Sequence, residues 1–151
     1  MTTDSTPPPL EAEAPPVQEE PAAALPAVLV VEDDESIAYL LVFMLEREGF
    51  KVHLCQDGRQ ARKYVEENAS TDIVVLDIAL PYLDGFGLIR VMRDRIAWES
   101  TPIIMLTAKA QEQDVAKALR AGANDYLLKP FHPADLLARV HKLCRRETPA
   151  S

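Results

Sequence analysis

Val28-Leu29-Val30-Val31-Glu32-Asp33-Asp34 passes abruptly from four apolar residues to three acids. An unbroken, largely β-branched run of this length predicts a strand that is buried on both faces of a parallel sheet. Three more apolar runs also end at a polar residue, namely at Asp77, Thr107 and Lys129. The carboxyl ends of the strands in an open α/β sheet line a single crevice, so we expect these residues to meet there.

Apolar runs alternate with amphipathic segments from residue 28 onward, which is typical of βα units on a parallel sheet. We expect strands near 28–32, 51–55, 72–76, 102–106 and 124–128. We expect helices near 35–48, 58–68, 85–95, 111–121 and 133–146. Gly49 follows the first of these helices and suits a helix end.

The 151 residues predict one folded domain with a short extension at each end. Residues 1–27 contain seven Pro, six Ala and five acidic residues and no Lys or Arg. This composition cannot bury enough apolar surface to fold, so we expect a disordered Pro/Ala/Glu-rich tail. The folded domain is expected over 28–146, and 147–151 is expected to be a disordered C-terminus that leaves no room for an output domain.

Charge and cysteine content exclude several classes of function. The formal net charge is −8, of which the five acids of residues 1–27 supply most, so the folded part is only slightly acidic. This argues against nucleic-acid binding by bulk electrostatics. No segment resembles a signal peptide or reaches membrane-spanning length, and Cys55 and Cys144 are expected to be reduced. We therefore expect a soluble, cytoplasmic protein that does not bind membranes.

The acids at the expected crevice indicate a divalent metal site. Clustered carboxylates raise each other's pKa unless a cation compensates them. The acidic run Glu32-Asp33-Asp34, of which not all three side chains can point into the crevice, and Asp77 offer only hard oxygens, which favours Mg²⁺ or Mn²⁺ over zinc. The three histidines have no metal-ligand spacing.

The same residues suit phosphoryl transfer to an aspartate. This reaction needs an in-line nucleophile and compensation for the charge on the phosphoryl oxygens. Asp77 would attack, while Lys129 and Thr107 would each bind a phosphoryl oxygen. Ala108 is small enough to leave the donor a route of approach. Whether the Lys129–Pro130 bond is cis stays open at this point.

These residues resemble the receiver domain of two-component response regulators. The matching motifs are Val28 to Asp34, Val74-Val75-Leu76-Asp77, Leu80-Pro81-Tyr82-Leu83-Asp84-Gly85, Met105-Leu106-Thr107-Ala108-Lys109 and Gly122 to Phe131. They occur in order at compatible spacings over 28 to about 146. The resemblance implies a doubly wound, flavodoxin-like (CheY-like) α/β fold with a five-stranded parallel sheet in the order 2-1-3-4-5.

The resemblance also implies a role for each matched residue. Asp77 becomes the phosphoacceptor, and Thr107 and Lys129 bind the phosphoryl group. Asp33 becomes a direct Mg²⁺ ligand, Glu32 a water-mediated one, and the backbone carbonyl of Ala79 a third protein contact. Tyr126 matches the family's aromatic switch, which would move with Thr107 and change the surface formed by residues 111–121, 124–128 and 133–146. The chain would catalyse only its own phosphorylation and dephosphorylation and would not otherwise be an enzyme.

Residues 122–140 most resemble receivers of the OmpR/PhoB type, which dimerise through that surface using charge pairs. Asp125, Asp135 and Arg139 match part of the pattern, whereas Val115 stands where a basic partner would be expected. A phosphorylation-dependent homodimer therefore stays open. The implied partners are a sensor histidine kinase or histidine phosphotransfer protein, and a protein effector bound in trans.

Two other functions compete with this one. A phosphatase with an aspartate nucleophile would carry a second acid two residues after the nucleophile, but that residue is Ala79. A receiver-fold binding module that no longer uses phosphate would be expected to lose part of the set formed by Glu32, Asp33, Asp77, Thr107 and Lys129.

Overall fold

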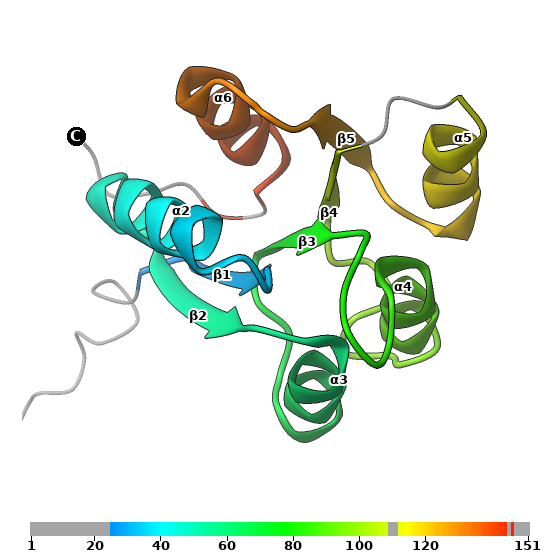
Figure 1. Cartoon of the computed structure of the whole chain (residues 1–151). Coiled ribbons are helices and arrows are strands. Elements are labelled where there is room, and N and C mark those ends of the chain that lie inside the picture. The colour runs from blue at the N-terminus through cyan, green and yellow to red at the C-terminus, as the bar shows by residue number, and fades with distance from the viewer. Residues whose placement is uncertain (1–24, 109–111, 145, 147–151) are drawn as a thin grey trace, which may run out of the picture.

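Five parallel strands form one sheet at the centre of the molecule (Figure 1). The computed structural model describes residues 25–108, 112–144 and 146. The strands are β1 (Ala27–Val31), β2 (Lys51–Cys55), β3 (Ile73–Asp77), β4 (Ile103–Thr107) and β5 (Asp125–Leu128). Their order across the sheet is β2-β1-β3-β4-β5, which is the order that the sequence analysis expected.

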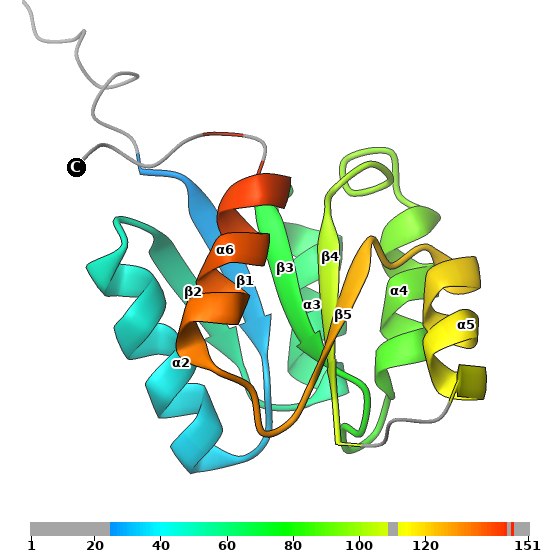
Figure 2. The same ribbon diagram turned by 90° about the horizontal axis from the view of Figure 1, so that it is seen from above.

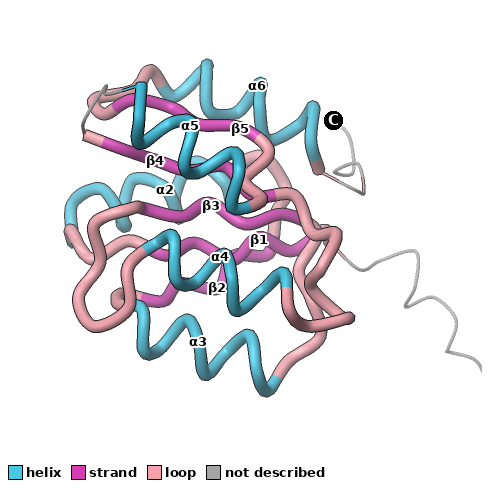
Figure 3. Tube along the Cα trace, turned by 90° about the vertical axis from the view of Figure 1, so that its right-hand side faces the viewer, coloured by secondary structure: helices cyan, strands magenta, loops and turns pink. Residues whose placement is uncertain are grey.

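Helices cover both faces of the sheet. They are α2 (Glu35–Arg47), α3 (Gly58–Glu67), α4 (Gly85–Arg93), α5 (Glu112–Ala121) and α6 (Pro133–Leu143). α2 and α6 lie on one face, and α3, α4 and α5 follow one another across the other (Figures 1 and 3). None of the helices in the described ranges is long and apolar enough to cross a membrane.

Side chains along each strand point alternately to the two faces of the sheet, so the core has two layers. In β3, Ile73 and Val75 pack with α2 and α6, whereas Val74 and Leu76 pack with α3 and α4. All four side chains are fully buried. Each such aliphatic side chain contributes roughly 1.5–3 kcal/mol through burial, which makes the strands a rigid support for the loops at their ends.

Aspartates begin three of the helices at the carboxyl edge of the sheet. Asp34 accepts a hydrogen bond from the backbone N–H of Ile37 at 2.9 Å, and Asp57 and Asp84 cap α3 and α4 in the same way. Gly58 lets α3 approach the next loop, since a Cβ there would lie 1.9 Å from the Leu83 carbonyl oxygen. The loop after β3 is therefore fixed against α3.

The opposite, amino edge is held together by the Arg93 guanidinium at the end of α4. It donates to the backbone carbonyls of Gly122 (2.6 Å from Nη2), Trp98 (3.0 Å) and Glu99 (3.0 Å), and to the side-chain oxygen of Asn124 (3.2 Å). Burial lowers the pKa of Arg93. One side chain thus ties the loop that leads into β4 to the loop that leads into β5.

Arg146 makes a second link at this edge. Its guanidinium lies 3.2 Å from a carboxylate oxygen of Asp72 and donates to the Leu25 carbonyl at 2.7 Å. Asp72 also accepts from the Ala27 N–H at 2.7 Å. The two ends of the described chain therefore meet beside the start of β1, at the amino ends of the strands (Figure 2).

Strand and helix positions agree with the sequence analysis to within a residue or two, with one exception. The last helix ends at Leu143 and not at 146, because Cys144 adopts an extended backbone conformation. The Lys129–Pro130 bond, which the sequence left open, is cis. Residues 1–24 and 147–151, which include almost all of both expected disordered extensions, lie outside the described residues.

Candidate functional site

The carboxyl edge brings the predicted site residues together in one cleft of about 660 Å³. Glu32 and Asp33 directly follow β1, Asp77 ends β3, Thr107 ends β4, and Lys129 directly follows β5. The cleft is lined by Glu32, Asp33, Asp34, Ile37, Asp77, Ile78, Ala79, Thr107, Ala108, Asp114 and Lys129. Residues almost 100 positions apart in the sequence therefore share one site.

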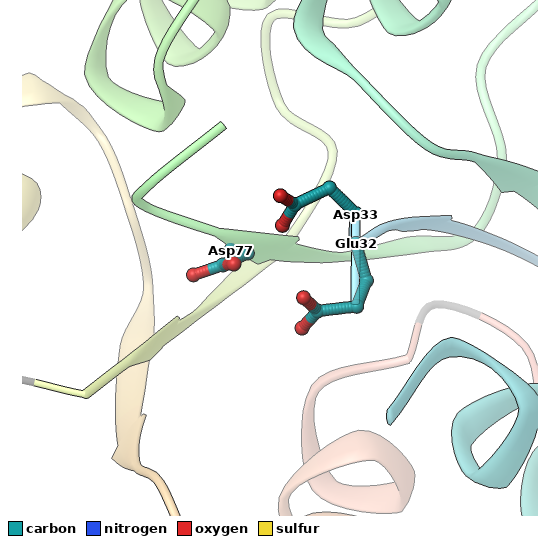
Figure 4. Close-up of side chains that lie close together, drawn as sticks. All are labelled: Glu32, Asp33 and Asp77. Atoms are coloured by element: carbon teal, nitrogen blue, oxygen red, sulfur yellow. The ribbon is translucent and has the colours of Figure 1, made fainter. Parts of the chain in front are cut away.

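Three carboxylates face one another in this cleft (Figure 4). Glu32, Asp33 and Asp77 each offer an oxygen that lies within 4.8 Å of the other two. Glu32 is fully buried and Asp77 is 5% exposed, whereas Asp33 is exposed at the mouth. Like charges this close repel one another strongly where water is largely excluded.

Lys129 bridges two of these carboxylates. Its ammonium nitrogen Nζ lies 2.7 Å from Glu32 Oε1 and 3.2 Å from Asp77 Oδ2. Burial alone would lower the pKa of Lys129, but the contact with Glu32 and the charge of Asp77 raise it. Its backbone N–H donates to the Thr107 carbonyl at 2.8 Å, which anchors the base of the side chain to the end of β4.

One ammonium does not balance the three acids. Burial raises the pKa of Glu32 to about 7; Lys129 opposes this shift and the charge of Asp77 adds to it. A carboxylate oxygen has two lone pairs, so Glu32 Oε1 can accept a further contact besides the one from Lys129. An all-oxygen donor set with excess negative charge fits a hard divalent cation such as Mg²⁺ or Mn²⁺.

Thr107 and Ala79 also line the cleft that contains Asp77. Thr107 is 4% exposed and belongs to β4, where the neighbouring Leu106 pairs with Asp77 in register. The backbone N–H of Ala79 lies 3.3 Å from Asp77 Oδ1 and donates to it. The methyl side chain of Ala79 adds no functional group to the cleft, and neither does that of Ala108, which is exposed.

Tyr126 and the predicted dimer residues lie at a different cleft, of about 500 Å³, between β5 and α6. Tyr126 is 36% exposed. Arg139 Nη1 lies 2.7 Å from Asp125 Oδ1 within the same chain, and Asp135 is exposed beside this pair. The roles in switching and dimerisation stay predictions.

Asp114, the third residue of α5, lines the main cleft but is missing from the sequence-based set. A signal for it existed. In a βα unit the helix begins at the carboxyl edge of the sheet, so an acid in the first turn after Thr107 lies near the crevice. The predicted set for the cleft came only from residues at the strand ends and therefore did not include Asp114.

Comparison with known proteins agrees with this geometry. A family model described as the response regulator receiver domain matches residues 28–141. The phosphate regulon transcriptional regulatory protein PhoB of Rhizobium meliloti is 42% identical over 125 residues, which cover 83% of this chain and 55% of that protein. The alkaline phosphatase synthesis transcriptional regulatory protein PhoP of Bacillus subtilis is 44% identical over 119 residues, covering 79% and 48%. The chain thus spans about half the length of these curated relatives.

Two solved structures are similar to this chain over almost their whole length. A putative response regulator from Chloroflexus aurantiacus aligns with a TM-score of 0.76 and 33% identity, covering 82% of this chain and all of that one. The receiver domain of a sensor histidine kinase from Pseudomonas aeruginosa aligns with a TM-score of 0.73 and 37% identity, covering 80% and 98%. That structure has a magnesium ion coordinated in its active-site cleft.

Proposed function

Since this chain belongs to the response regulator receiver domain family, we propose that Asp77 accepts a phosphoryl group from a phosphohistidine on a partner protein. The observation that carries the proposal is the environment of Asp77. This carboxylate is nearly buried, lies 3.2 Å from the Lys129 ammonium, and shares its cleft with two further acids. A structural ion pair needs no such excess of negative charge.

Glu32, Asp33, Asp77 and the backbone carbonyl of Ala79 are the groups that would hold Mg²⁺ in this proposal, with Glu32 acting through a water molecule. Mn²⁺ has the same preference for oxygen ligands. When bound, the ion would supply positive charge to the phosphoryl oxygens that become more negative during transfer.

The protein's own residues carry the transfer step. A carboxylate oxygen of Asp77 forms a bond to phosphorus, the bond from phosphorus to the donor imidazole nitrogen breaks, and the imidazole leaves with the electron pair. Lys129 is already close enough to Asp77 to donate to one phosphoryl oxygen, and the Thr107 hydroxyl donates to another. The side chain of Ala108 is small, so the donor phosphohistidine has space to approach in line with the attacking oxygen of Asp77.

Phosphorylation would then alter the surface of α5, β5 and α6. Tyr126 pairs with Met105 in β4, so its ring projects from the same sheet face as Met105 and Thr107. Movement of Thr107 toward the phosphoryl group would free space for the ring. The result would be a shift between two packings, limited by the difference in their contacts.

This surface is where we place the downstream partner, a protein effector bound in trans or a second phosphorylated copy of the chain. In a dimer, Asp125 and Arg139 would have to exchange their present intrachain contact for one across the interface. A sensor histidine kinase or histidine phosphotransfer protein would supply the phosphoryl group. We expect no direct nucleic-acid contact from this domain, and no catalysis beyond its own phosphorylation and dephosphorylation.

The alternatives have less support. Ala79 offers no second acid for a phosphatase, and the residues expected to be lost from a phosphate-independent module are all present around the cleft.

The test is incubation with acetyl phosphate and Mg²⁺, followed by intact-mass measurement. The wild type should gain one phosphoryl mass and Asp77→Asn none. The control is Asp94→Asn, which removes one exposed charge at the end of α4 and should label like the wild type. Undiminished labelling of Asp77→Asn would exclude Asp77 as the acceptor.

A further inference from the structure

The cleft around Asp77 is lined by more acidic than basic side chains among the described residues. Within that part of the chain, five carboxylates line it against a single ammonium, that of Lys129. The acids are Glu32, Asp33, Asp34, Asp77 and Asp114.

Four of these acids already have an interaction or a proposed role. Glu32 and Asp77 contact Lys129, Asp33 belongs to the carboxylate trio, and Asp34 caps α2. Asp114 is partly buried and belongs to a different element, α5, on the Thr107 side of the cleft. Within the described ranges, its carboxylate makes no ion pair or hydrogen bond. Its charge is therefore left to act on whatever enters the cleft.

We infer that Asp114 sets the electrostatic selectivity of the cleft: it favours entry of the divalent cation and opposes small anionic phosphodonors. The inference rests on the proposed phosphorylation of Asp77. It makes Asp114 a specificity-determining residue for that reaction without direct participation in bond making.

The sign of each effect follows from Coulomb's law. A fixed negative charge attracts a divalent cation and repels a phosphodonor that carries two negative charges. The low-dielectric walls of the cleft focus this field. For charges separated by about 8–10 Å near a surface, the effect on a dianion is on the order of 2- to 5-fold in rate at low salt.

A donor presented by a protein would be affected differently. A phosphohistidine approaches as part of a docked surface, whose other contacts can offset the repulsion from one carboxylate. A free acyl phosphate has no such contacts. Asp114 would therefore bias the chain toward protein donors and against phosphorylation by free metabolites.

The experiment compares Asp114→Asn with the wild type at saturating Mg²⁺, using acetyl phosphate as the probe. In this reaction the Asp77 oxygen bonds to phosphorus, the bond from phosphorus to the acetyl oxygen breaks, and acetate leaves. Asp114→Asn should raise the initial rate about threefold at roughly 10 mM ionic strength, and the advantage should largely vanish near 1 M, where the screening length is about 3 Å. Phosphoramidate, which carries less negative charge, should show a smaller gain.

A second measurement does not depend on activity. Because the same charge attracts the cation, Asp114→Asn should shift the Mg²⁺ midpoint of a thermal-stability titration to roughly twofold higher concentration. A change in helix stability alone would move the melting temperature without moving this midpoint, and it would not produce a salt-dependent rate ratio.

The matched control is Asp94→Asn, which makes the same change of charge at the amino edge and should leave rate and midpoint unchanged. A rate ratio of one for Asp114→Asn, a ratio that does not change with salt, or an equal effect of Asp94→Asn would overturn the inference. If the wild type takes up no phosphoryl group, or if Asp77→Asn still does, the proposed function fails instead.

Discussion

The charged side chains at the two edges of the sheet differ in how fully they are paired. At the amino edge, the one guanidinium of Arg93 is matched by several carbonyl and amide oxygens, and Arg146 faces the carboxylate of Asp72. At the carboxyl edge, five carboxylates share one ammonium among the described residues, so negative charge is left unmatched there. The amino edge also leaves one group unmatched, the buried hydroxyl of Thr101, but that group is neutral.

The difference separates the part of the molecule that stabilises the fold from the part where we propose that phosphoryl transfer takes place. Buried charges without compensation cost stability unless a ligand arrives to balance them. The amino edge can stabilise the fold in all conditions, whereas the carboxyl edge gains stability only when a cation or a phosphoryl group changes its charge. Substitutions at the two edges should therefore have different signatures.

The largest effect on stability should come from Arg93→Met. This change keeps much of the apolar stem but removes donors from the carbonyls of Gly122, Trp98 and Glu99. We expect a loss of about 3 kcal/mol in the free energy of unfolding, because several partly buried acceptors lose their partners together. Urea unfolding measures it.

The control for Arg93 is Arg90→Met, on the exposed side of the same helix, which should change stability by less than about 0.5 kcal/mol. Folded Arg93→Met should still accept a phosphoryl group from acetyl phosphate. Equal stability of the two variants would remove the contrast between the edges.

An intermediate effect should come from metal at the other edge. Mg²⁺ at ten times its dissociation constant should stabilise the wild type by about 1.4 kcal/mol, and chelation with EDTA should reverse this. Asp33→Ala removes an exposed carboxylate of the trio, so it should lose most of this stabilisation while costing little stability without metal. Thermal melts with and without Mg²⁺ measure both quantities.

Asp94→Ala is the control for Asp33→Ala and should keep the full Mg²⁺ response. An identical Mg²⁺ response in wild type and Asp33→Ala would argue against the metal site.

The smallest effect should come from Arg146→Ala. Its guanidinium is about half exposed, so its contacts with Asp72 and Leu25 should contribute only about 0.5 kcal/mol. Chemical unfolding beside Lys142→Ala, an exposed basic residue on α6, would detect the difference. A loss of several kcal/mol would mean that the amino edge depends on this link as much as on Arg93.

The pattern of apolar runs along the sequence predicted the fold and most of the residues that line the cleft. β3 and β4 are buried on both faces and have to be apolar throughout, so Asp77 and Thr107 marked their ends clearly. β5 is a partly exposed edge strand, against the expectation of full burial, but its apolar run still ended at Lys129. Once the strands are parallel, their carboxyl ends must share an edge, and the clustering follows without knowledge of any contact.

Features that depend on distant partners could not be predicted in this way. The helical pattern ran through Arg146, but its side chain binds Asp72, 74 positions away, after the helix has ended at Leu143. The contact between Lys129 and Glu32 could not be predicted either, because it requires both side chains to be buried in the cleft. Asp114 was not predicted because the predicted set for the cleft came only from residues at the strand ends.

The meeting of residues 25 and 146 has a practical consequence. Both lie by the start of β1, at the amino edge of the sheet, whereas Asp77 ends β3 at the carboxyl edge. A bead, dye or fused reporter attached through either end would leave the mouth of the cleft pointing into solution. Immobilisation in this way would let the proposed phosphorylation of Asp77 be measured without obstructing the approach of a donor.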